Sequence, residues 1–455
     1  MGSVPSSELY TQLTSGVLFP LQEWIKKHPT VRVRREMERS QWWSGEDLQA
    51  LRLERLRRLL VHAERHVPYY RDLFARVGFR SENLRSTADI QELPLLTKAD
   101  IRANTEALKS EEAVDLSRLN TGGSTGQPLI FFVGRERVTH DVAAKWRATR
   151  WWGVDIGDRE IVMWGSPIEL TSQDRMRDVR DRLFRTELLS AFQMSDEKLD
   201  DFVRRIRARR PKMLFGYPSA IALVAKFAEK RRIAMDDLGI KVAFVTAERL
   251  YDEQKESIGR VFGCSVANGY GGRDSGFIAH QCPNGGMHVT AEDVIVEIVD
   301  GERRIQAPGE SGEIVVTHLA TKDFPFIRYR TGDFGVLDDA RCSCGRGLPL
   351  LKEIKGRATD FVVSQDGTVM HGLALIYVVR DLPGIDAFKI VQEDRLLTRV
   401  LIVPGESYRP EIEAKIVSGF KARLGQAVRV QIERVDRLDA EPSGKFRYVV
   451  SRIAA

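Results

Sequence analysis

The sequence predicts an α/β protein. We expect a large N-terminal domain with mixed parallel sheets and helices plus a β-rich subdomain, and then a small, mobile α+β domain. Three observations predict this class: a helical lead-in, an alternation of short apolar runs with helical stretches, and a final region of closely spaced strands. The length of 455 residues suggests two or three domains.

The lead-in, residues 1–115, has the pattern of helices. Between Leu48 and Leu60, leucines recur at three- and four-residue steps, which places them along one face of a helix. Ser44 stands just before acidic residues, and Thr97 stands three residues before Asp100. Both arrangements predict helix starts.

From about residue 118 the pattern changes to alternating strands and helices. Apolar runs typical of strands occupy residues 129–133, 161–164, 213–215 and 242–245. Helical patterns occupy residues 195–208 and 219–230. This alternation predicts an α/β core with largely parallel strands.

The last third of the chain is predicted to be richer in strands. Runs at 294–299, 314–318 and 334–337 follow one another closely, which favours antiparallel pairing. Strands at 400–403 and 428–432 flank an amphipathic helix at 411–424. We therefore predict a large domain over 1–357, a hinge at 358–360 and a small domain over 361–455.

Composition and charge exclude several classes of protein. Hydrophobic residues make up 43% of the chain and charged residues 29%, unlike disordered or collagen-like chains. No run approaches the roughly 20 apolar residues of a transmembrane helix. The absence of an apolar leader and the four cysteines predict a cytoplasmic protein. The net charge of +6 is mild, and the basic clusters carry no nucleic-acid-binding motif, so no nucleic-acid partner is expected.

A glycine-rich loop precedes the first of these strands. Residues 119–129 read Leu-Asn-Thr-Gly-Gly-Ser-Thr-Gly-Gln-Pro-Leu. Glycines and hydroxyls beside exposed amides can surround a phosphate chain. The spacing fits neither a Walker A loop nor a dinucleotide fingerprint. An ordinary turn is the alternative reading of this loop alone.

Four further motifs follow in a fixed order. They are Asn-Gly-Tyr-Gly-Gly-Arg-Asp at 268–274, Ile-Arg-Tyr-Arg-Thr-Gly-Asp at 327–333, Gly-Arg-Ala-Thr-Asp at 356–360 and Pro-Ser-Gly-Lys-Phe-Arg at 442–447. With the loop, this set resembles the adenylate-forming superfamily of acyl-CoA synthetases, luciferases and adenylation domains. Segments such as Gly-Tyr-Pro-Ser at 216–219 and Thr-Ala-Glu at 246–248 resemble the phenylacetate–CoA ligase branch, closest to its CapK-like members.

The resemblance, over roughly residues 60–450, implies how ATP is bound. The loop would hold the β- and γ-phosphates through Thr121, Gly122, Gly123, Ser124, Thr125 and Gly126. The nucleotide would be lined by Thr246, Ala247, Glu248, Tyr270 and Gly271, with Tyr270 against the adenine. Asp333 would accept hydrogen bonds from the ribose hydroxyls, and Arg357 would approach the ribose or a phosphate. Leu129 stands where many relatives have lysine, so one phosphate-facing cation is absent.

The resemblance also implies three catalytic residues. Asp274 would bind Mg²⁺ at a position where the family usually has Glu, with a shorter reach. Asp360 would be the hinge about which the small domain swings. Lys445 would enter the site only in the adenylating arrangement, where its charge meets the α-phosphate and the carboxylate.

Three cysteines and one histidine predict a structural zinc site. Cys282 and His288 form one pair, and Cys342 and Cys344 form another. Three sulfurs and one imidazole suit tetrahedral Zn²⁺ with no open position. The alternatives are ordinary thiols and a His288 that serves the acyl pocket.

The predicted activity is ATP-dependent conversion of a small carboxylic acid into an acyl-adenylate and then a CoA thioester. The predicted cofactors are ATP, Mg²⁺, CoA and structural Zn²⁺. One alternative transfers the acyl group to an amine or a sugar hydroxyl, and another is a nucleotide-binding regulator with reduced catalysis. A homodimer is one oligomeric state compatible with the sequence.

Overall fold

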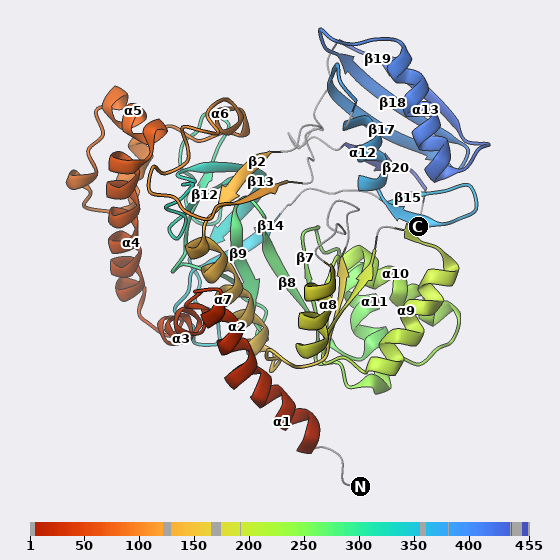
Figure 1. Ribbon diagram of the computed structural model, residues 1–455, viewed down its shortest axis with the longest axis horizontal. Coiled ribbons are helices and arrows are strands. Elements are labelled where there is room, and N and C mark those ends of the chain that lie inside the picture. The colour runs from red at the N-terminus through yellow and green to blue at the C-terminus, as the bar shows by residue number, and fades with distance from the viewer. Residues whose placement is uncertain are drawn as a thin grey trace.

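The computed structural model describes residues 5–121, 129–164, 174–191, 193–354, 361–380, 382–436, 438 and 448–453 (Figure 1). Helices cover the N-terminal part, as the sequence predicts. They are α1 (Pro5–Leu13), the π-helix η1 (Thr14–Leu18), α2 (Phe19–Ile25), α3 (Thr30–Ser40), α4 (Gly45–His66), α5 (Pro68–Val77), the short turns η2 (Ser81–Asn83) and η3 (Thr87–Glu92), and α6 (Lys98–Ala103).

The two predicted helix starts are confirmed. The Ser44 side chain accepts a hydrogen bond from the Asp47 amide at 3.1 Å, which caps α4. Thr97 and Asp100 exchange side-chain and backbone hydrogen bonds in a capping box at the start of α6. In both cases a short polar side chain satisfies an amide that the first helical turn leaves without a partner.

One mixed sheet of 11 strands forms the centre of the molecule, in the order β11-β12-β13-β14-β10-β9-β8-β7-β6-β3-β4. The strands from β4 to β8 are parallel, and those from β8 to β11 are antiparallel. The parallel half comprises β3 (Glu160–Trp164), β4 (Thr186–Ser190), β6 (Met213–Gly216), β7 (Val242–Thr246) and β8 (Ser265–Gly272). The antiparallel half comprises β9 (Gly276–Gln281), β10 (Met287–Val289), β11 (Val294–Val299), β12 (Ser311–His318), β13 (Tyr329–Asp338) and β14 (Leu350–Ile354).

This sheet modifies the predicted architecture. The sequence predicts a β-rich subdomain beside the parallel core, whereas β9 pairs directly with β8 and continues the same sheet. A separate hairpin, β1 (Ser117–Asn120) and β2 (Ile130–Val133), carries the two ends of the glycine-rich loop. The helices of this region are α7 (Arg135–Trp151), α8 (Asp174–Leu183), α9 (Asp196–Arg209), α10 (Pro218–Lys230), η5 (Asp236–Leu238) and α11 (Asp252–Phe262). The largest apolar cluster packs α9, α10 and α11 against the parallel strands.

The C-terminal part forms its own small sheet, β19-β18-β17-β20, with a separate apolar core (Figure 1). Its elements are β15 (Phe361–Val363), β16 (Val369–His371), α12 (Leu373–Arg380), β17 (Ile385–Asp394), β18 (Leu397–Pro404), α13 (Glu411–Leu424), β19 (Arg429–Arg434) and β20 (Val449–Ser451). Strand β16 also pairs with β5 (Gln193–Met194) of the preceding part. The predicted hinge, 358–360, lies outside the described residues.

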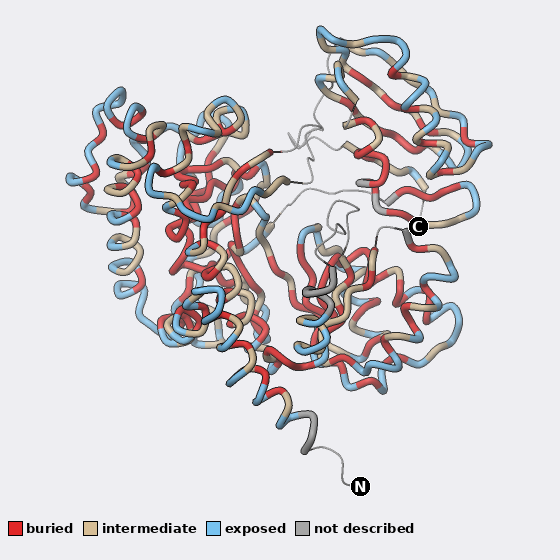
Figure 2. The backbone as a smooth tube through the Cα atoms, viewed as in Figure 1, coloured by how far each residue is buried: buried red, intermediate tan, exposed pale blue. Residues whose placement is uncertain are grey.

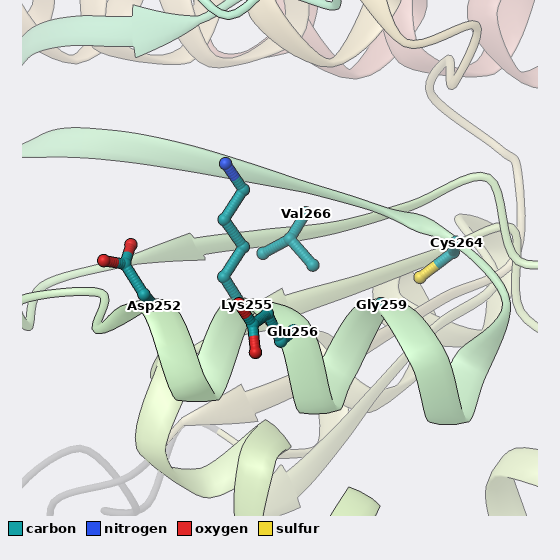
Figure 3. Close-up of a pocket in the computed structure, with 6 residues that line it drawn as sticks. All are labelled: Asp252, Lys255, Glu256, Gly259, Cys264 and Val266. Atoms are coloured by element: carbon teal, nitrogen blue, oxygen red, sulfur yellow. The ribbon is translucent and has the colours of Figure 1, made fainter.

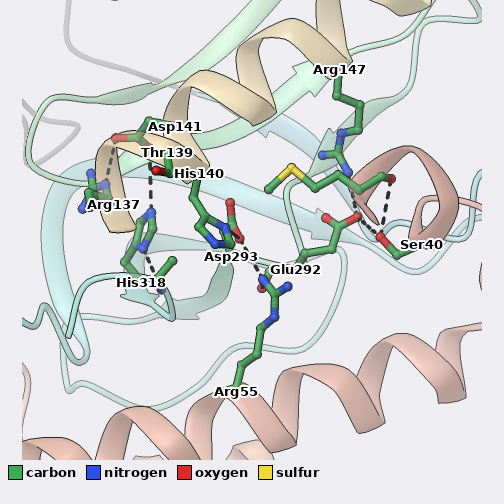
Figure 4. Close-up of polar contacts among 12 residues, drawn as sticks. Ser40, Arg55, Arg137, Thr139, His140, Asp141, Arg147, Glu292, Asp293 and His318 are labelled. Carbon is green, nitrogen blue, oxygen red and sulfur yellow. Dashed lines mark hydrogen bonds and ion pairs between the residues drawn. The ribbon is translucent and has the colours of Figure 1, made fainter. Parts of the chain in front are cut away.

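Buried ion pairs fasten the N-terminal helices to the sheet (Figure 4). Arg147 of α7 donates to Glu292 at 2.7 Å, and both side chains are almost fully buried. The hydroxyl of Ser40, at the end of α3, donates to the same carboxylate oxygen at 2.7 Å. Asp293 next to it accepts from Arg55 of α4 at 3.0 Å. Three helices therefore meet on one two-residue acidic segment. Figure 2 shows that buried residues gather in the interior of the molecule, whereas exposed residues lie along the outer helices.

A fully buried histidine near this network is expected to make the stability of the fold depend on pH. Burial, and secondarily the charge of Arg147, lowers the pKa of His280 to about 3. Its ring stacks on Phe277 at a centroid distance of 5.2 Å, and neither ring nitrogen has a hydrogen-bond partner among the described residues. The folded-state pKa of His280 lies below its unfolded value. The stability that the neutral, buried ring contributes is therefore fully present above about pH 6.5 and is lost as the pH falls toward 3.

We expect the free energy of unfolding to fall between pH 7 and pH 5, with about 2 kcal/mol of the loss due to His280. The substitution His280→Phe, measured by denaturant unfolding at both pH values, should remove that part of the slope. The same change at His66 on helix α4 is the control. An unchanged pH slope in His280→Phe would contradict this account.

Candidate active site

The carboxyl ends of the parallel strands bring several predicted segments to one edge of the sheet. Gly216 pairs with Met163 and Val245, and Thr246 pairs with Gly269. The residues that follow these strands therefore lie next to one another. Ligands of open α/β sheets bind at this edge, outside the strand ends.

The segment after β7 has an unusual backbone. Ala247 has φ of 72°, a left-handed conformation that residues with a β-carbon adopt at a cost of about 1–3 kcal/mol. Ser219, at the start of α10, donates a hydrogen bond to the Glu248 carboxylate. The turn thus presents Thr246, Ala247 and Glu248 along the strand end and fixes the last of them to the neighbouring helix.

Two pairs of polar side chains connect β13 with β8 and the turn after it. The Tyr270 hydroxyl donates to Asp333 at 3.2 Å, and the Tyr329 hydroxyl donates to Asp274 at 2.5 Å. Strands β8 and β13 have three strands between them in the sheet, so the antiparallel half curves enough to bring their side chains together. The predicted adenine, ribose and Mg²⁺ residues consequently share one location.

The Asp274 carboxylate is fixed in place on both oxygens. One accepts from Tyr329, and the other accepts from the Ser275 amide at 3.0 Å. Arg137, almost fully buried, contacts the carbonyl of Asp274 at 3.4 Å and pairs with Asp141 at 2.8 Å. Each oxygen retains a lone pair, so the chemistry of this carboxylate fits a Mg²⁺ ligand.

The base of the glycine-rich loop lies beside this location. The Thr121 amide donates to the Leu129 carbonyl at 3.0 Å, and the Leu129 amide donates to the Thr121 hydroxyl at 3.1 Å. Arg273 donates to the Asn120 carbonyl at 3.4 Å, which connects the loop with the Asp274 turn. Leu129 is fully buried in the apolar core.

Several predicted residues fall outside the described part of the chain. They are the loop residues Gly122, Gly123, Ser124, Thr125 and Gly126, together with Arg357, Asp360 and Lys445. Their roles stay predictions. The described members of the predicted site are Thr121, Thr246, Ala247, Glu248, Tyr270, Gly271, Asp274 and Asp333.

The predicted metal ligands come together at another edge of the sheet. One ligand atom from each of Cys282, His288, Cys342 and Cys344 lies within 4.8 Å of the others. The sulfurs of Cys282 and Cys342 are 3.6 Å apart, and the Cys344 sulfur is 3.2 Å from His288 Nε2. Zn–S bonds of about 2.3 Å at a tetrahedral centre place two sulfurs about 3.8 Å apart. The donor set and its spacing therefore fit zinc.

The surroundings of these four residues suit a metal site. His288 Nδ1 faces the Leu348 carbonyl at 3.4 Å, which leaves Nε2 to face the sulfurs. A β-carbon at Gly286 would lie 2.6 Å from the Cys342 sulfur, so only glycine fits this turn. Burial lowers the pKa of His288 to about 4, which keeps the imidazole neutral as a ligand requires.

A solvent-open pocket of about 440 Å³ lies elsewhere, between α11 and β8 (Figure 3). Its lining consists of Asp252, Lys255, Glu256, Gly259, Cys264 and Val266. None of these is a predicted site residue. Its charged side chains come from one exposed helix face, and no polar groups converge on it from a second element, so it is not the catalytic centre.

The sequence did not predict a role for two residues that contact the site. Tyr329 lies inside the motif at 327–333, and its hydroxyl is the closest partner of Asp274. Arg137 lies on α7, 137 residues before Asp274 in the chain, and only its burial in the structure indicates its contribution. The position of Tyr329 four residues before Asp333 could have suggested the first.

Comparisons with known proteins show which proteins this chain resembles. Residues 362–452 match the family model of the CapK C-terminal domain. Protein CapK of Staphylococcus aureus is 23% identical over 418 residues, 90% of each chain. Phenylacetate-coenzyme A ligase of Thermus thermophilus is 25% identical over 392 residues, 84% of each chain. Over most of its length the chain is similar to CapK and to phenylacetate–CoA ligases, and its C-terminal part matches the CapK model. The predicted resemblance to these proteins is confirmed.

Two further proteins are similar to this chain over most of its length. Phenylacetate-coenzyme A ligase of Pseudomonas putida is 28% identical over 333 residues, 70% of this chain and 73% of the relative. The solved 2-hydroxyisobutyryl-CoA ligase in complex with 2-HIB-AMP and CoA matches with a TM-score of 0.64 and 21% identity over 91% of both chains. This likeness shows the shared fold. Among the described residues, none of the helices combines the length and apolar character needed to span a bilayer.

Proposed function

We propose that this protein activates a carboxylic acid with ATP, releases pyrophosphate, and transfers the acyl group from the acyl-adenylate to the thiol of CoA. The observation that carries the proposal is the meeting of the Tyr270–Asp333 and Tyr329–Asp274 pairs beside the loop base at Thr121. An acceptor for ribose hydroxyls, an acceptor for a hard cation and a loop for phosphates are the parts that adenylation requires. The coenzyme A ligases among the relatives support the same reaction.

The described residues would act mainly by positioning. Asp333, oriented by Tyr270, would hold the ribose, while Tyr270 packs beside the adenine. Asp274 would hold Mg²⁺, which would neutralise charge on the phosphates as pyrophosphate leaves. Tyr329 would keep the Asp274 carboxylate in one orientation. Lys445 would place a positive charge at the α-phosphate and the acid carboxylate, and Asp360 would be the hinge that brings it there.

The acyl pocket is proposed at the same strand ends. Trp164 stacks on Tyr217 with ring centroids 4.5 Å apart. Gly216, just before Tyr217, has no room for a side chain, because a β-carbon there would lie 2.0 Å from the Met163 carbonyl oxygen. Flat aromatic walls suit an aryl or a short apolar acid. A screen of aryl, fatty and amino acids for pyrophosphate release, with and without CoA, tests this. A thioester product supports a CoA ligase, whereas acid activation with transfer only to an added amine or hydroxyl supports the alternative acceptor.

We expect Asp333→Ala to weaken ATP binding by roughly 2–4 kcal/mol, because two charge-assisted hydrogen bonds to the ribose are lost. The measurement compares ATP with its 2′,3′-dideoxy analogue on wild type and variant. The exposed Asp339, just beyond the same strand, provides the control Asp339→Ala. Equal discrimination between the two nucleotides by wild type and Asp333→Ala would rule out Asp333 as the ribose acceptor.

We also propose that Cys282, His288, Cys342 and Cys344 hold one structural zinc ion. The site would join the β9–β10 connection to the loop before β14. That loop contacts the N-terminal helices, since Gln41 at the end of α3 accepts hydrogen bonds from Arg346 at 3.2 Å and from the Gly347 amide at 2.9 Å. All four positions are filled by protein ligands, so the ion would stabilise the fold rather than take part in catalysis.

A further inference from the structure

The N-terminal helix presents an apolar stripe to solvent. Helices α1, η1 and α2 run without a break from Pro5 to Ile25, and α1 extends away from the body of the molecule (Figure 1). Trp24 is 75% exposed and Leu9 is 62% exposed. The other exposed apolar members of this stripe are Leu13, Val17, Leu21 and Ile25.

The opposite face, which contacts the protein, is largely polar. The Thr11 hydroxyl donates to Asp158 at 2.9 Å, and the Tyr10 hydroxyl donates to the Leu183 carbonyl at 2.9 Å. Thr14 is fully buried against Gly157, where a β-carbon would lie 2.5 Å from the threonine β-carbon. A surface helix of a monomer normally buries its apolar stripe. Here several polar contacts hold the helix, and its apolar stripe has no cover within the described residues.

The π-helical turn keeps this stripe on one face. The apolar residues recur every four positions from Leu9 to Ile25. In an ordinary α-helix that spacing drifts by about 40° at each step. The turn η1, Thr14–Leu18, accommodates an extra residue in the middle of the helix and counteracts the drift. The local structure and the sequence spacing therefore produce a continuous surface.

We infer that this stripe pairs with the same stripe of a second copy, antiparallel and about a two-fold axis at Val17. In that register Leu13 lies opposite Leu21, and Leu9 lies opposite Ile25. The charges at the two ends are also complementary, because exposed Glu8 comes opposite exposed Lys26. An isologous interface requires this kind of self-complementarity.

The charge pattern favours a second copy over a lipid surface. Helices that lie on membranes carry Lys and Arg along their polar face. Here the residues that flank the stripe, Gln12 and Ser15, are uncharged, Glu8 marks one end, and the cations Lys26 and Lys27 lie only at the other. A cation at one end and an acid at the other match an antiparallel partner.

Cross-linking of the full chain tests the register. Val17→Cys, placed on the two-fold axis, should form a disulfide-linked dimer under mild oxidation. A mixture of Leu13→Cys and Leu21→Cys chains should link to each other more than either links to itself. Gln12→Cys, off the stripe, and the wild-type chain with its native cysteines are the controls. Cross-linking no higher at Val17→Cys than at Gln12→Cys would overturn the proposal.

Solution mass tests the interface without new thiols. Light scattering at micromolar concentration should give twice the chain mass of 51.6 kDa. Leu13→Glu should raise the dissociation constant at least tenfold, whereas Gln12→Glu should not. Glu8→Lys should weaken the dimer, and adding Lys26→Glu should restore it. Circular dichroism melting checks that each variant is folded. If Leu13→Glu does not fold, the cross-linking at Val17→Cys decides whether the interface exists.

Two results would contradict the proposal. The first is a wild-type chain that stays monomeric at all concentrations tested. The second is a monomer that sediments with vesicles of anionic or neutral phospholipid and loses that binding on Leu13→Glu, which would assign the stripe to a membrane surface instead.

Discussion

Replacing Lys445 by alanine is expected to slow acyl-adenylate formation by about 10²–10³-fold, because a positive charge is lost where charge develops on the α-phosphate. Formation of the thioester from preformed adenylate should change far less, since the predicted swing of the small domain takes Lys445 out of the site for that step. Single-turnover measurements of the two half-reactions provide the comparison.

Lys415→Ala is the matched control for this experiment. Lys415 is exposed on α13 of the same small domain, and its loss removes the same charge without touching the predicted site. It should leave both half-reactions unchanged. Equal damage to both half-reactions by Lys445→Ala would contradict the hinge-and-lysine account, and no damage to either would remove Lys445 from catalysis.

Loss of the proposed zinc ion is expected to have the largest effect on stability. Cys282→Ser, or treatment with a zinc-selective chelator, should lower the free energy of unfolding by more than about 4 kcal/mol, since the four-ligand site is then lost. The melting temperature should fall by roughly 4 °C or more, since unfolding entropy scales with the 455 residues of the chain. After chelation, added Mg²⁺ should still be required for any remaining adenylation, because the two proposed metal sites are separate.

Cys264→Ser is the control, because Cys264 is the one cysteine outside the cluster. Elemental analysis of protein purified without added metal should give one zinc per chain. A ratio well below one, with all four cysteines reacting freely with a thiol reagent in the native state, would leave these residues as ordinary thiols.

Much of the fold is predictable from local sequence. The strand at 161–164 and the helix at 411–424 lie where the pattern predicts, as β3 and α13. The continuity of the 11-stranded sheet was not predictable, because it depends on which strand β9 pairs with rather than on the pattern within β9. The polar attachment of the N-terminal helix likewise depends on Gly157 and Asp158, which are about 145 residues away from it.

In the candidate site, too, local motifs could be predicted from the sequence, whereas contacts between distant segments could not. Through the resemblance, the motifs at 268–274 and 327–333 predict that Asp274 accepts Mg²⁺ and that Asp333 accepts the ribose hydroxyls. The sequence does not reveal that each receives a tyrosine hydroxyl, because those contacts require the sheet to curve between β8 and β13. The clustering of the four predicted metal ligands was predictable, because a set of three cysteines and one histidine is rare and the spacing within each pair is local.

Exchange of labelled pyrophosphate into ATP tests the central claim most directly, because it reports reversible adenylate formation without CoA and without any assumption about the acyl acceptor. The account predicts Mg²⁺-dependent exchange that appears only when an accepted carboxylic acid is present and is nearly abolished in Lys445→Ala. Chain that binds ATP but shows no exchange with any aryl, fatty or amino acid would contradict adenylation and identify a nucleotide-binding regulator instead.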